Sequence, residues 1–300
     1  MSNRIPWARI GATVAGAAVG AATALVVAAQ LRPRVLHTPT RVPPEPLPPG
    51  ARFPHEDFSP VLRAIVDEDG LVDYAALRRD PMGLYRFVAW IEAYSPQNTP
   101  AFFPADADRL AYWLNAYNAL ALLAVCDAYP VASILQVRPV GRVFYALRFP
   151  VGGTLMTLEE IEHGVIRPVF HDARTHFALS PAARGGPRLR REAYLPERLE
   201  EQLGDQMRRF LTDDEKVRVD VMNRALLVSP IFTWFADDFT TWLRDTAPDQ
   251  PNDLITMMLP YLSDVGRTVV IDDNYPLRYR AYDWRLNASP RATETMQEAA

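Results

Sequence analysis

The 300-residue sequence contains a single cysteine, Cys126. An intrachain disulfide and a cysteine-based metal cluster are therefore both excluded. Lysine is just as scarce, because Lys216 is the only one and arginine supplies the other basic side chains apart from histidine. Since alanine and proline are abundant at the same time, we interpret this pattern as a bias of genome composition and not as a sign of phosphate recognition.

Strong positive charge and familiar catalytic motifs are missing as well. The formal net charge is −4, and the first 50 residues are basic, so the rest of the chain is more acidic than the whole. A net negative charge argues against a nucleic-acid partner, because the phosphate backbone is negative as well. The chain has no Gly-rich phosphate loop, no GxSxG, no HExxH and no internal repeat. We therefore predict no cofactor and no motif-based metal centre.

Residues 1–31 are predicted to form a signal peptide or a membrane-anchor helix. Arg4 and Arg9 precede Ile10–Ala29, a stretch without charge that is almost entirely Ala, Gly and Val. Twenty such residues can just span a bilayer, and they also fit a signal peptide cut near Gln30. We expect a protein anchored on the exported, periplasmic side of a membrane; secretion after cleavage is the alternative.

Residues 32–56 are predicted to be a linker, because seven prolines between positions 39 and 54 favour an extended, semi-rigid spacer. We expect His37 and His55 to be solvated. A single globular domain follows over 57–287, and 288–300 is predicted to be a flexible tail. Helical patterns mixed with scattered short strands favour a mostly helical α+β domain. Among the strands we predict 217–221, 225–228 and 268–271.

The central element is a predicted helix over Asp106–Ala128, which is apolar on every side and therefore buried. Asn115 and Asn118 are its only strongly polar side chains between 111 and 125, and they lie on one ridge. Buried amides need hydrogen-bond partners. They either clamp neighbouring loops or form the polar floor of a ligand site, and we predict the second role for both.

A second helix is predicted from Thr157, where Thr157 and Glu160 form a capping box. Glu162 falls within the apolar stripe of this helix, and His163 lies at the edge of the stripe. Burying an unpaired carboxylate is costly, so Glu162 is either a paired structural anchor or a tuned acid/base group.

After Pro168 a short strand is predicted to begin at His176 and to enter a Gly- and Pro-rich loop over 180–189. Catalytic groups are common at such strand ends, as are structural ones. We predict Glu162, His163 and His176 as catalytic acid/base residues. Arg174 and Ser180 are predicted to bind ligand together with the two asparagines. A three-ligand metal site from Glu162, His163 and His176 is a minor alternative.

Five sequence blocks, in order, resemble one family: AYWLNAYNAL at 111–120, LEEIEHGVIR at 158–167, DARTHFALS at 172–180, SPIFTWFADDF at 229–239 and AYDWRLN at 281–287. The family is the domain of unknown function numbered 547. The resemblance implies a bacterial or plant protein, often with a signal or membrane segment, and implies no particular reaction.

The family's loop after HFAL usually carries two cysteines, and here Pro181 and Gly186 stand in their places. If a loop thiolate is the family's nucleophile, this chain has lost it. We therefore expect an envelope domain that binds a small molecule or an envelope protein at the Glu162, His163 and His176 site, and that is a degenerate enzyme. The alternative is a hydrolase or transferase that uses these three residues as acid/base groups.

Overall fold

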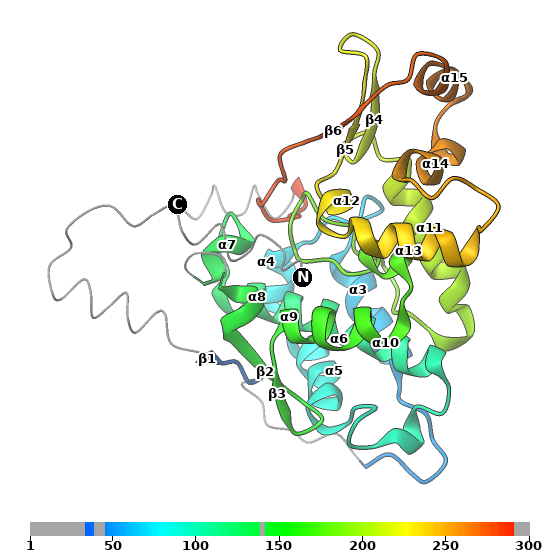
Figure 1. The fold of residues 1–300 in the computed structure, drawn as a ribbon. Helices are drawn as coiled ribbons and strands as arrows, with labels where there is room; N and C mark the ends of the chain where they lie inside the picture. Colours follow the sequence, from blue (N-terminus) through cyan, green and yellow to red (C-terminus); the bar gives the residue numbers. More distant parts are fainter. Residues whose placement is uncertain (1–33, 39–45, 139–141, 291–300) are drawn as a thin grey trace, which may run out of the picture.

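The computed structural model describes residues 34–38, 46–138 and 142–290 (Figure 1). The predicted α+β class is confirmed, with helices in the majority and two small three-stranded sheets. The helices are η1 (His55–Phe58), α3 (Ser59–Ile65), α4 (Tyr74–Arg79), α5 (Met82–Ala93), η2 (Pro100–Phe102), α6 (Asp106–Ala128), α7 (Ile134–Val137), α8 (Val143–Ala146), α9 (Leu158–Ile161), η4 (Glu162–Ile166), α10 (Arg167–Phe170), η5 (Ala173–Phe177), η6 (Pro196–Arg198), α11 (Leu199–Leu211), α12 (Ile231–Trp234), α13 (Ala236–Thr246), α14 (Leu254–Met258), η7 (Leu259–Tyr261) and α15 (Asp264–Asp272). The strands are β1 (Arg34–Val35), β2 (Leu147–Val151), β3 (Thr154–Met156), β4 (Val217–Asp220), β5 (Ala225–Val228) and β6 (Leu277–Tyr279).

Helix α6 is the centre of the larger hydrophobic core. It has the bounds predicted from the sequence, and its residues from Leu110 to Cys126 are all buried. Helices α4, α5 and α9 pack around it, and the sheet β1-β2-β3 packs against α5 through β2 (Figure 1). A helix that is apolar on every side is stable only in such a setting, because each of its faces needs an apolar neighbour.

A second hydrophobic core lies beside the first and is rich in phenylalanine. Phe177, Phe210, Phe232 and Phe239 bring η5, α11, α12 and α13 together, with ring centroids 4.9 to 6.0 Å apart. The sheet β4-β5-β6 and helices α14 and α15 extend this part of the fold, in the upper half of Figure 1.

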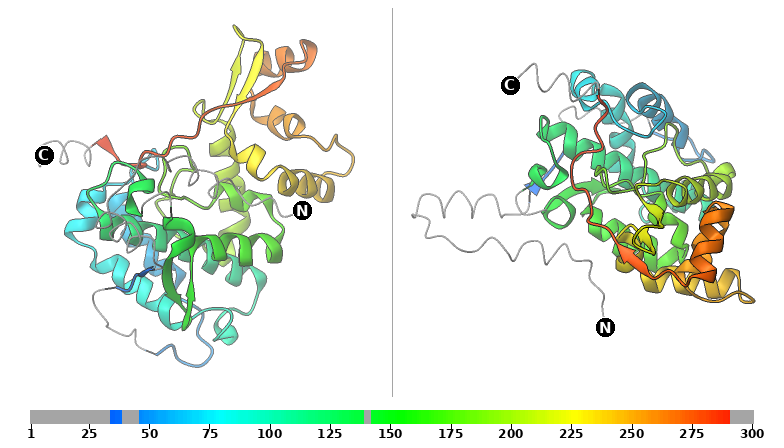
Figure 2. Two further views of the ribbon diagram at one scale, coloured as in Figure 1. Left: turned by 60° about the vertical axis from the view of Figure 1, so that its left-hand side comes forward. Right: turned by 90° about the horizontal axis from the view of Figure 1, so that it is seen from above.

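The C-terminal stretch connects the two cores. After β6 the chain runs back to the larger core, where Arg285, Leu286 and Ala288 form isolated bridges to distant segments (Figure 2). Tyr282 packs against both cores. Ala288 and Ser289, which follow the predicted end of the domain at 287, also contact the larger core: Ala288 bridges to Val72, and Ser289 N donates to the carbonyl of Val72.

Three local predictions are wrong. His176 lies in the 3-10 helix η5 and not in a strand, because Asp172 caps this turn by accepting from Arg174 N. The predicted strand over 268–271 belongs to helix α15, which Ser263 caps by accepting from Gly266 N. Tertiary context overrides the β-propensity of such branched residues.

The third concerns His55, which is not solvated but 2% exposed. Its ring contacts Phe53, and Asn115 Nδ2 lies 3.4 Å from its Nδ1. Burial lowers the pKa of His55 to about 3.

Among the described residues, no helix is both long and apolar enough to cross a bilayer. The predicted anchor or signal segment, 1–31, lies outside the described residues, as do 39–45 of the linker and 291–300 of the tail.

Candidate functional site

The predicted site residues Glu162, His163 and His176 come from two adjacent turns, η4 and η5, which face helix α13. The predicted capping box holds the start of this segment in place: Thr157 Oγ1 accepts from Glu160 N at 3.0 Å, and Thr157 N donates to Glu160 Oε2 at 2.9 Å. Glu162 and His163 therefore lie on the turn that follows a well-anchored helix.

The turn that carries Glu162 and His163 is π-helical. Pro168 has no N–H and cannot donate to Gly164, so the regular i to i−4 ladder is interrupted there. The backbone N–H of Arg167 instead bonds to the carbonyl of Glu162, five residues earlier. π-helical turns inside α-helices are frequent at functional sites.

His176 is the centre of the site, and a carboxyl group lies on either side of its ring. Its Nε2 is 2.8 Å from Asp238 Oδ2, and its Nδ1 is 3.9 Å from Glu162 Oε1. The side chain is 2% exposed, and Nδ1 has no hydrogen-bond partner among the described residues. A carboxylate on Nε2 favours the tautomer with its proton on that nitrogen, so Nδ1 presents a lone pair towards Glu162.

Arg167 holds Asp238 in position. Its Nε and Nη2 donate to the two oxygens of the Asp238 carboxylate at 2.6 and 2.9 Å, which is a bidentate pair. Its Nη1 donates to His163 Nδ1 at 2.6 Å, an arrangement that requires His163 to be neutral. His163 thus joins the site through Arg167 and makes no direct hydrogen bond to His176 among the described contacts.

Phe235 fixes the planes of these groups. Its ring stacks on His176 with the centroids 3.7 Å apart, and Arg167 Cζ lies 5.0 Å from the centre of the same ring. Cation–π contacts of this kind favour a single guanidinium orientation. Phe235 immediately precedes α13, so one short segment supplies both the aromatic surface and Asp238.

Burial separates the protonation states of the site residues. It raises the pKa of Glu162 to about 7, because the ionised carboxylate is poorly solvated. Burial and the nearby Arg167 charge lower the pKa of His163 to about 4. Burial also lowers the pKa of His176, against the opposing effect of Asp238. Hydrogen bonds from His176 and Arg167 outweigh burial at Asp238 and hold its pKa well below its usual value.

His176 lines two cavities. The larger is about 190 Å³ and lies on the Asp238 side, where Arg167, Asp172, Thr175 and Thr241 also line it. The smaller is about 30 Å³ and lies on the Glu162 side, between Tyr117, Trp234 and Tyr282. That space has room for about one water molecule, whereas the larger cavity can take several non-hydrogen atoms.

The two asparagines use their amides to hold loops. Asn115 exchanges two hydrogen bonds of 2.8 Å with the backbone of Tyr194, and Asn118 bonds to the backbone of Ala178 and Ser180 at 3.0 and 2.8 Å. These contacts match the loop-clamping alternative. Neither asparagine is among the residues that line the two cavities at His176.

The other two predicted ligand-binding residues also lie outside these linings. Arg174 forms a bidentate pair with Asp172 and a 2.9 Å ion pair with Glu200. Ser180 is 3% exposed, and its Oγ has no hydrogen-bond partner among the described residues. No group of three or more His, Cys, Asp or Glu in the described part of the chain is placed to hold a metal ion.

Sequence reasoning missed Arg167, Phe235 and Asp238. A signal for Arg167 was present, because it lies four residues after His163 on a helical segment and such residues are neighbours. Asp238 lies between Phe235 and Phe239 on the aromatic side of its helix, which marked it as a carboxylate close to the core. Its pairing with His176 spans 62 residues and depends on tertiary structure.

Residues 103–211 match the family described as "Protein of unknown function, DUF547". The predicted family is confirmed. The DUF547 match ends with α11, so it contains Glu162, His163 and His176, whereas Asp238 lies beyond it. No curated protein and no solved structure matched the chain.

The loop in which this chain departs from the DUF547 pattern lies at the site. Pro181 and Pro187 line the small cavity together with Glu162 and His176. A Cβ atom at Gly186 would lie 2.7 Å from Pro181 Cδ, so positions 181 and 186 are in contact. The two places where the resemblance puts cysteines are thus adjacent, and one of them faces the acid/base groups.

Proposed function

We propose that this DUF547 protein binds a small polar ligand at His176 and that it is a degenerate enzyme with acid/base groups but no nucleophile. The observation that carries the proposal is the arrangement around His176. A neutral imidazole held by Asp238 directs a free Nδ1 towards the protonatable Glu162, and Pro181 lines the same cavity.

The ligand occupies the 190 Å³ cavity and reaches His176 from the Asp238 side. The residues around that cavity are mostly polar, including Asp172, Thr175 and Thr241. Among the carboxylates that line this cavity, Asp238 is paired with Arg167 and Asp172 with Arg174, so neither presents an unpaired charge to a ligand. Small-molecule sites generally combine an enclosed surface with a few fixed polar groups.

Binding without turnover follows from the groups near the small cavity. Pro181 offers no nucleophile, and the only thiol, Cys126, is buried in α6 with its Sγ 3.9 Å from the carbonyl of Leu77. Ser180 Oγ is enclosed and does not line either cavity. Covalent catalysis needs a nucleophile within hydrogen-bond reach of its base.

A hydrolase or transferase is the second candidate, and one observation favours it. The pKa of Glu162 is raised to about 7 while His163 and His176 stay neutral, and such a separation is typical of general acid/base pairs. In this reaction a water molecule in the small cavity or the acceptor molecule itself would be the nucleophile.

One experiment separates the two candidates. A library of small polar compounds is screened by thermal shift and, in parallel, hydrolase substrates are screened for turnover, using wild type, His176→Gln and the exposed-site control His37→Gln. If the protein binds a ligand without catalysis, the screen should find compounds that stabilise wild type and His37→Gln but not His176→Gln, and no substrate should be turned over. Turnover that His176→Gln abolishes would establish the enzyme instead, and compounds that stabilise all three proteins equally would exclude the site.

We also propose that residues 1–31 tether the domain to a membrane on the exported side. Support comes from the uncharged stretch Ile10–Ala29 and from the proline-rich spacer that follows it. Alkaline carbonate extraction of membranes should leave the full-length chain in the pellet and release a chain that lacks 1–31. Release of the full-length chain would refute the tether.

A further inference from the structure

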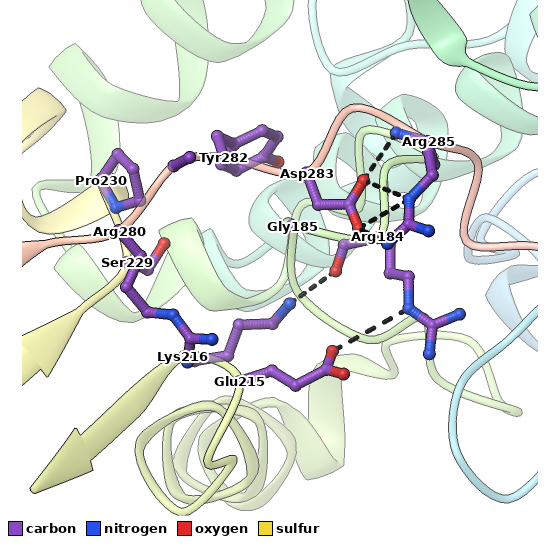
Figure 3. A pocket seen from close by; sticks show the side chains of 11 residues that line it. Arg184, Gly185, Glu215, Lys216, Ser229, Pro230, Arg280, Tyr282, Asp283 and Arg285 are labelled. Atoms are coloured by element: carbon purple, nitrogen blue, oxygen red, sulfur yellow. Dashed lines mark hydrogen bonds and ion pairs between the residues drawn. The ribbon is translucent and has the colours of Figure 1, made fainter. Parts of the chain in front are cut away.

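A further polar cavity, of about 260 Å³, is lined by 184–185, by the residues just before β4 and just after β5, and by residues 280–285 of the C-terminal stretch. Four of its lining residues are basic, namely Arg184, Lys216, Arg280 and Arg285, and two are acidic, namely Glu215 and Asp283. Figure 3 shows Lys216 and Arg280 entering from one side, with Arg184, Asp283 and Arg285 on the other. Tyr282 is the lining residue shared with the small cavity at His176.

Lys216, the only lysine of the chain, is 4% exposed in this cavity. Its Nζ donates one hydrogen bond, of 2.5 Å, to the carbonyl of Arg184. An ammonium group has three donors, so two are left for another acceptor. No carboxylate of the described chain lies within 4.0 Å of this Nζ. Burial is costly for such a cation, and it lowers the pKa of Lys216 against the opposing effect of the nearby Asp213, Glu215 and Asp283.

Arg280 is the second cation without a carboxylate partner. Its Nη1 donates to the backbone carbonyl of Asp214 at 2.7 Å, and that acceptor carries no net charge. The other two arginines that line the cavity, in contrast, lie near carboxylates. Arg285 forms a close bidentate pair with Asp283, and Arg184 Nε lies 4.0 Å from Glu215 Oε2. Lys216 and Arg280 thus have no ion-pair partner within 4.0 Å among the described residues, although Asp213, Glu215 and Asp283 lie near enough to favour the charged form of Lys216.

We propose that this cavity binds the phosphate group of a small phosphorylated molecule. The two cations without an ion-pair partner match the charge of about −1.5 to −2 that a phosphate monoester carries at neutral pH. A guanidinium and an ammonium together can supply several donors to the three terminal phosphate oxygens. The arginine-rich composition gave no such indication; the positions of Lys216 and Arg280 in the fold do.

The size of the cavity limits the ligand class. Typical drug-sized ligands occupy about 300 to 1,000 Å³, so 260 Å³ suits a compact phosphate ester better than a nucleotide. Tyr282 is the one aromatic residue among those that line the cavity. This phosphate site goes beyond the proposed function at His176 and does not depend on it.

The test is calorimetric titration of the full-length chain, in a neutral detergent at pH 7.5, with inorganic phosphate against potassium chloride of equal ionic strength. Phosphate should bind, and acetate should bind at least tenfold more weakly because it has a single charge. Lys216→Met and Arg280→Met should each weaken phosphate binding at least tenfold, whereas Arg244→Met, at an exposed position on α13, should not change it. Glu215→Gln should strengthen binding, because it removes a negative charge from the cavity lining.

A second readout uses the single lysine. Because Lys216 is the only one, a sample labelled with 15N-lysine gives one side-chain ammonium signal, and phosphate should shift it in wild type and in Arg244→Met. The proposal is overturned if phosphate binds no better than chloride or acetate, or if the Lys216 signal does not respond. It is equally overturned if Arg280→Met, whose side chain is only half-buried, folds and retains wild-type affinity.

Discussion

Replacing Glu162 with glutamine should stabilise the protein at alkaline pH and not at acidic pH. Glutamine has nearly the shape of a protonated glutamic acid but cannot ionise. The wild-type side chain is 11% exposed, and burial raises its pKa from the ordinary 4.5 to about 7. The ionised form is therefore disfavoured in the folded protein, and the variant avoids this cost.

The sign and size follow from proton linkage. Between pH 4.5 and 7 the folded protein holds the Glu162 proton while the unfolded chain has released it, so the free energy of unfolding falls as the pH rises. A difference of one pKa unit between the folded and the unfolded protein corresponds to about 1.4 kcal/mol in the free energy of unfolding. With a folded pKa of about 7, the wild type loses about 3 kcal/mol by pH 8.5, and Glu162→Gln loses none of it through this group.

Urea unfolding at pH 4.5 and 8.5, followed by tryptophan fluorescence, measures this difference. The variant should gain about 3 kcal/mol relative to wild type between the two pH values. The control Glu197→Gln, at an exposed position, should change the free energy of unfolding by less than about 0.5 kcal/mol at either pH. A difference that is the same at both pH values would refute the raised pKa. If Glu162→Gln is less stable relative to wild type at pH 8.5 than at pH 4.5, the charge of Glu162 is stabilised by a partner.

Three further changes test the network around His176. Asp238→Asn leaves Arg167 without its counter-charge, and we expect it to lower the free energy of unfolding by about 2 kcal/mol in urea titrations; an unchanged value would contradict the pairing. Arg167→Gln removes the positive charge beside His163 and should raise the pKa of that residue above about 4 in an NMR titration, whereas a further decrease would be inconsistent with the contact. Asn118→Ala leaves the buried N–H of Ser180 unpaired and the carbonyl of Ala178 with only the 3.4 Å hydrogen bond from Tyr194 Oη, and should cost about 2 kcal/mol of stability without changing ligand affinity; lost affinity at unchanged stability would assign Asn118 to the site.

Much of the local structure could be predicted because it depends on neighbouring residues. The long helix Asp106–Ala128 was predicted with its observed bounds, since apolar residues on every face over six turns fit no other element. The capping box at Thr157 and the strands predicted at 217–221 and 225–228, observed as β4 and β5, are equally local. The turn between β2 and β3 also depends on a distant residue: Gly152 has a φ of +54°, and a Cβ there would lie 2.1 Å from Ser95 Oγ, so this turn requires glycine.

The arrangement of the site could be predicted only in part. Glu162 is predicted as a site residue because it is a carboxylate in an apolar stripe, and His176 because it begins a short apolar segment beside a loop. The structure places His176 Nδ1 3.9 Å from Glu162 Oε1. Asp238 was not chosen, because nothing near it in sequence indicates that the Phe-rich core brings α13 against η5. His55 was misjudged for the same reason, since its burial is due to Phe53 and to Asn115 on α6.

The central claim is that His176 is a neutral imidazole, protonated on Nε2 towards Asp238 and open at Nδ1 towards Glu162. Long-range 15N–1H correlation spectra of histidine-labelled protein at pH 7 report the protonation state and tautomer of this ring directly. The account predicts a neutral ring with its proton on Nε2, and a change of tautomer or charge in Asp238→Asn. A doubly protonated ring at pH 7, or a neutral ring with its proton on Nδ1, would contradict it.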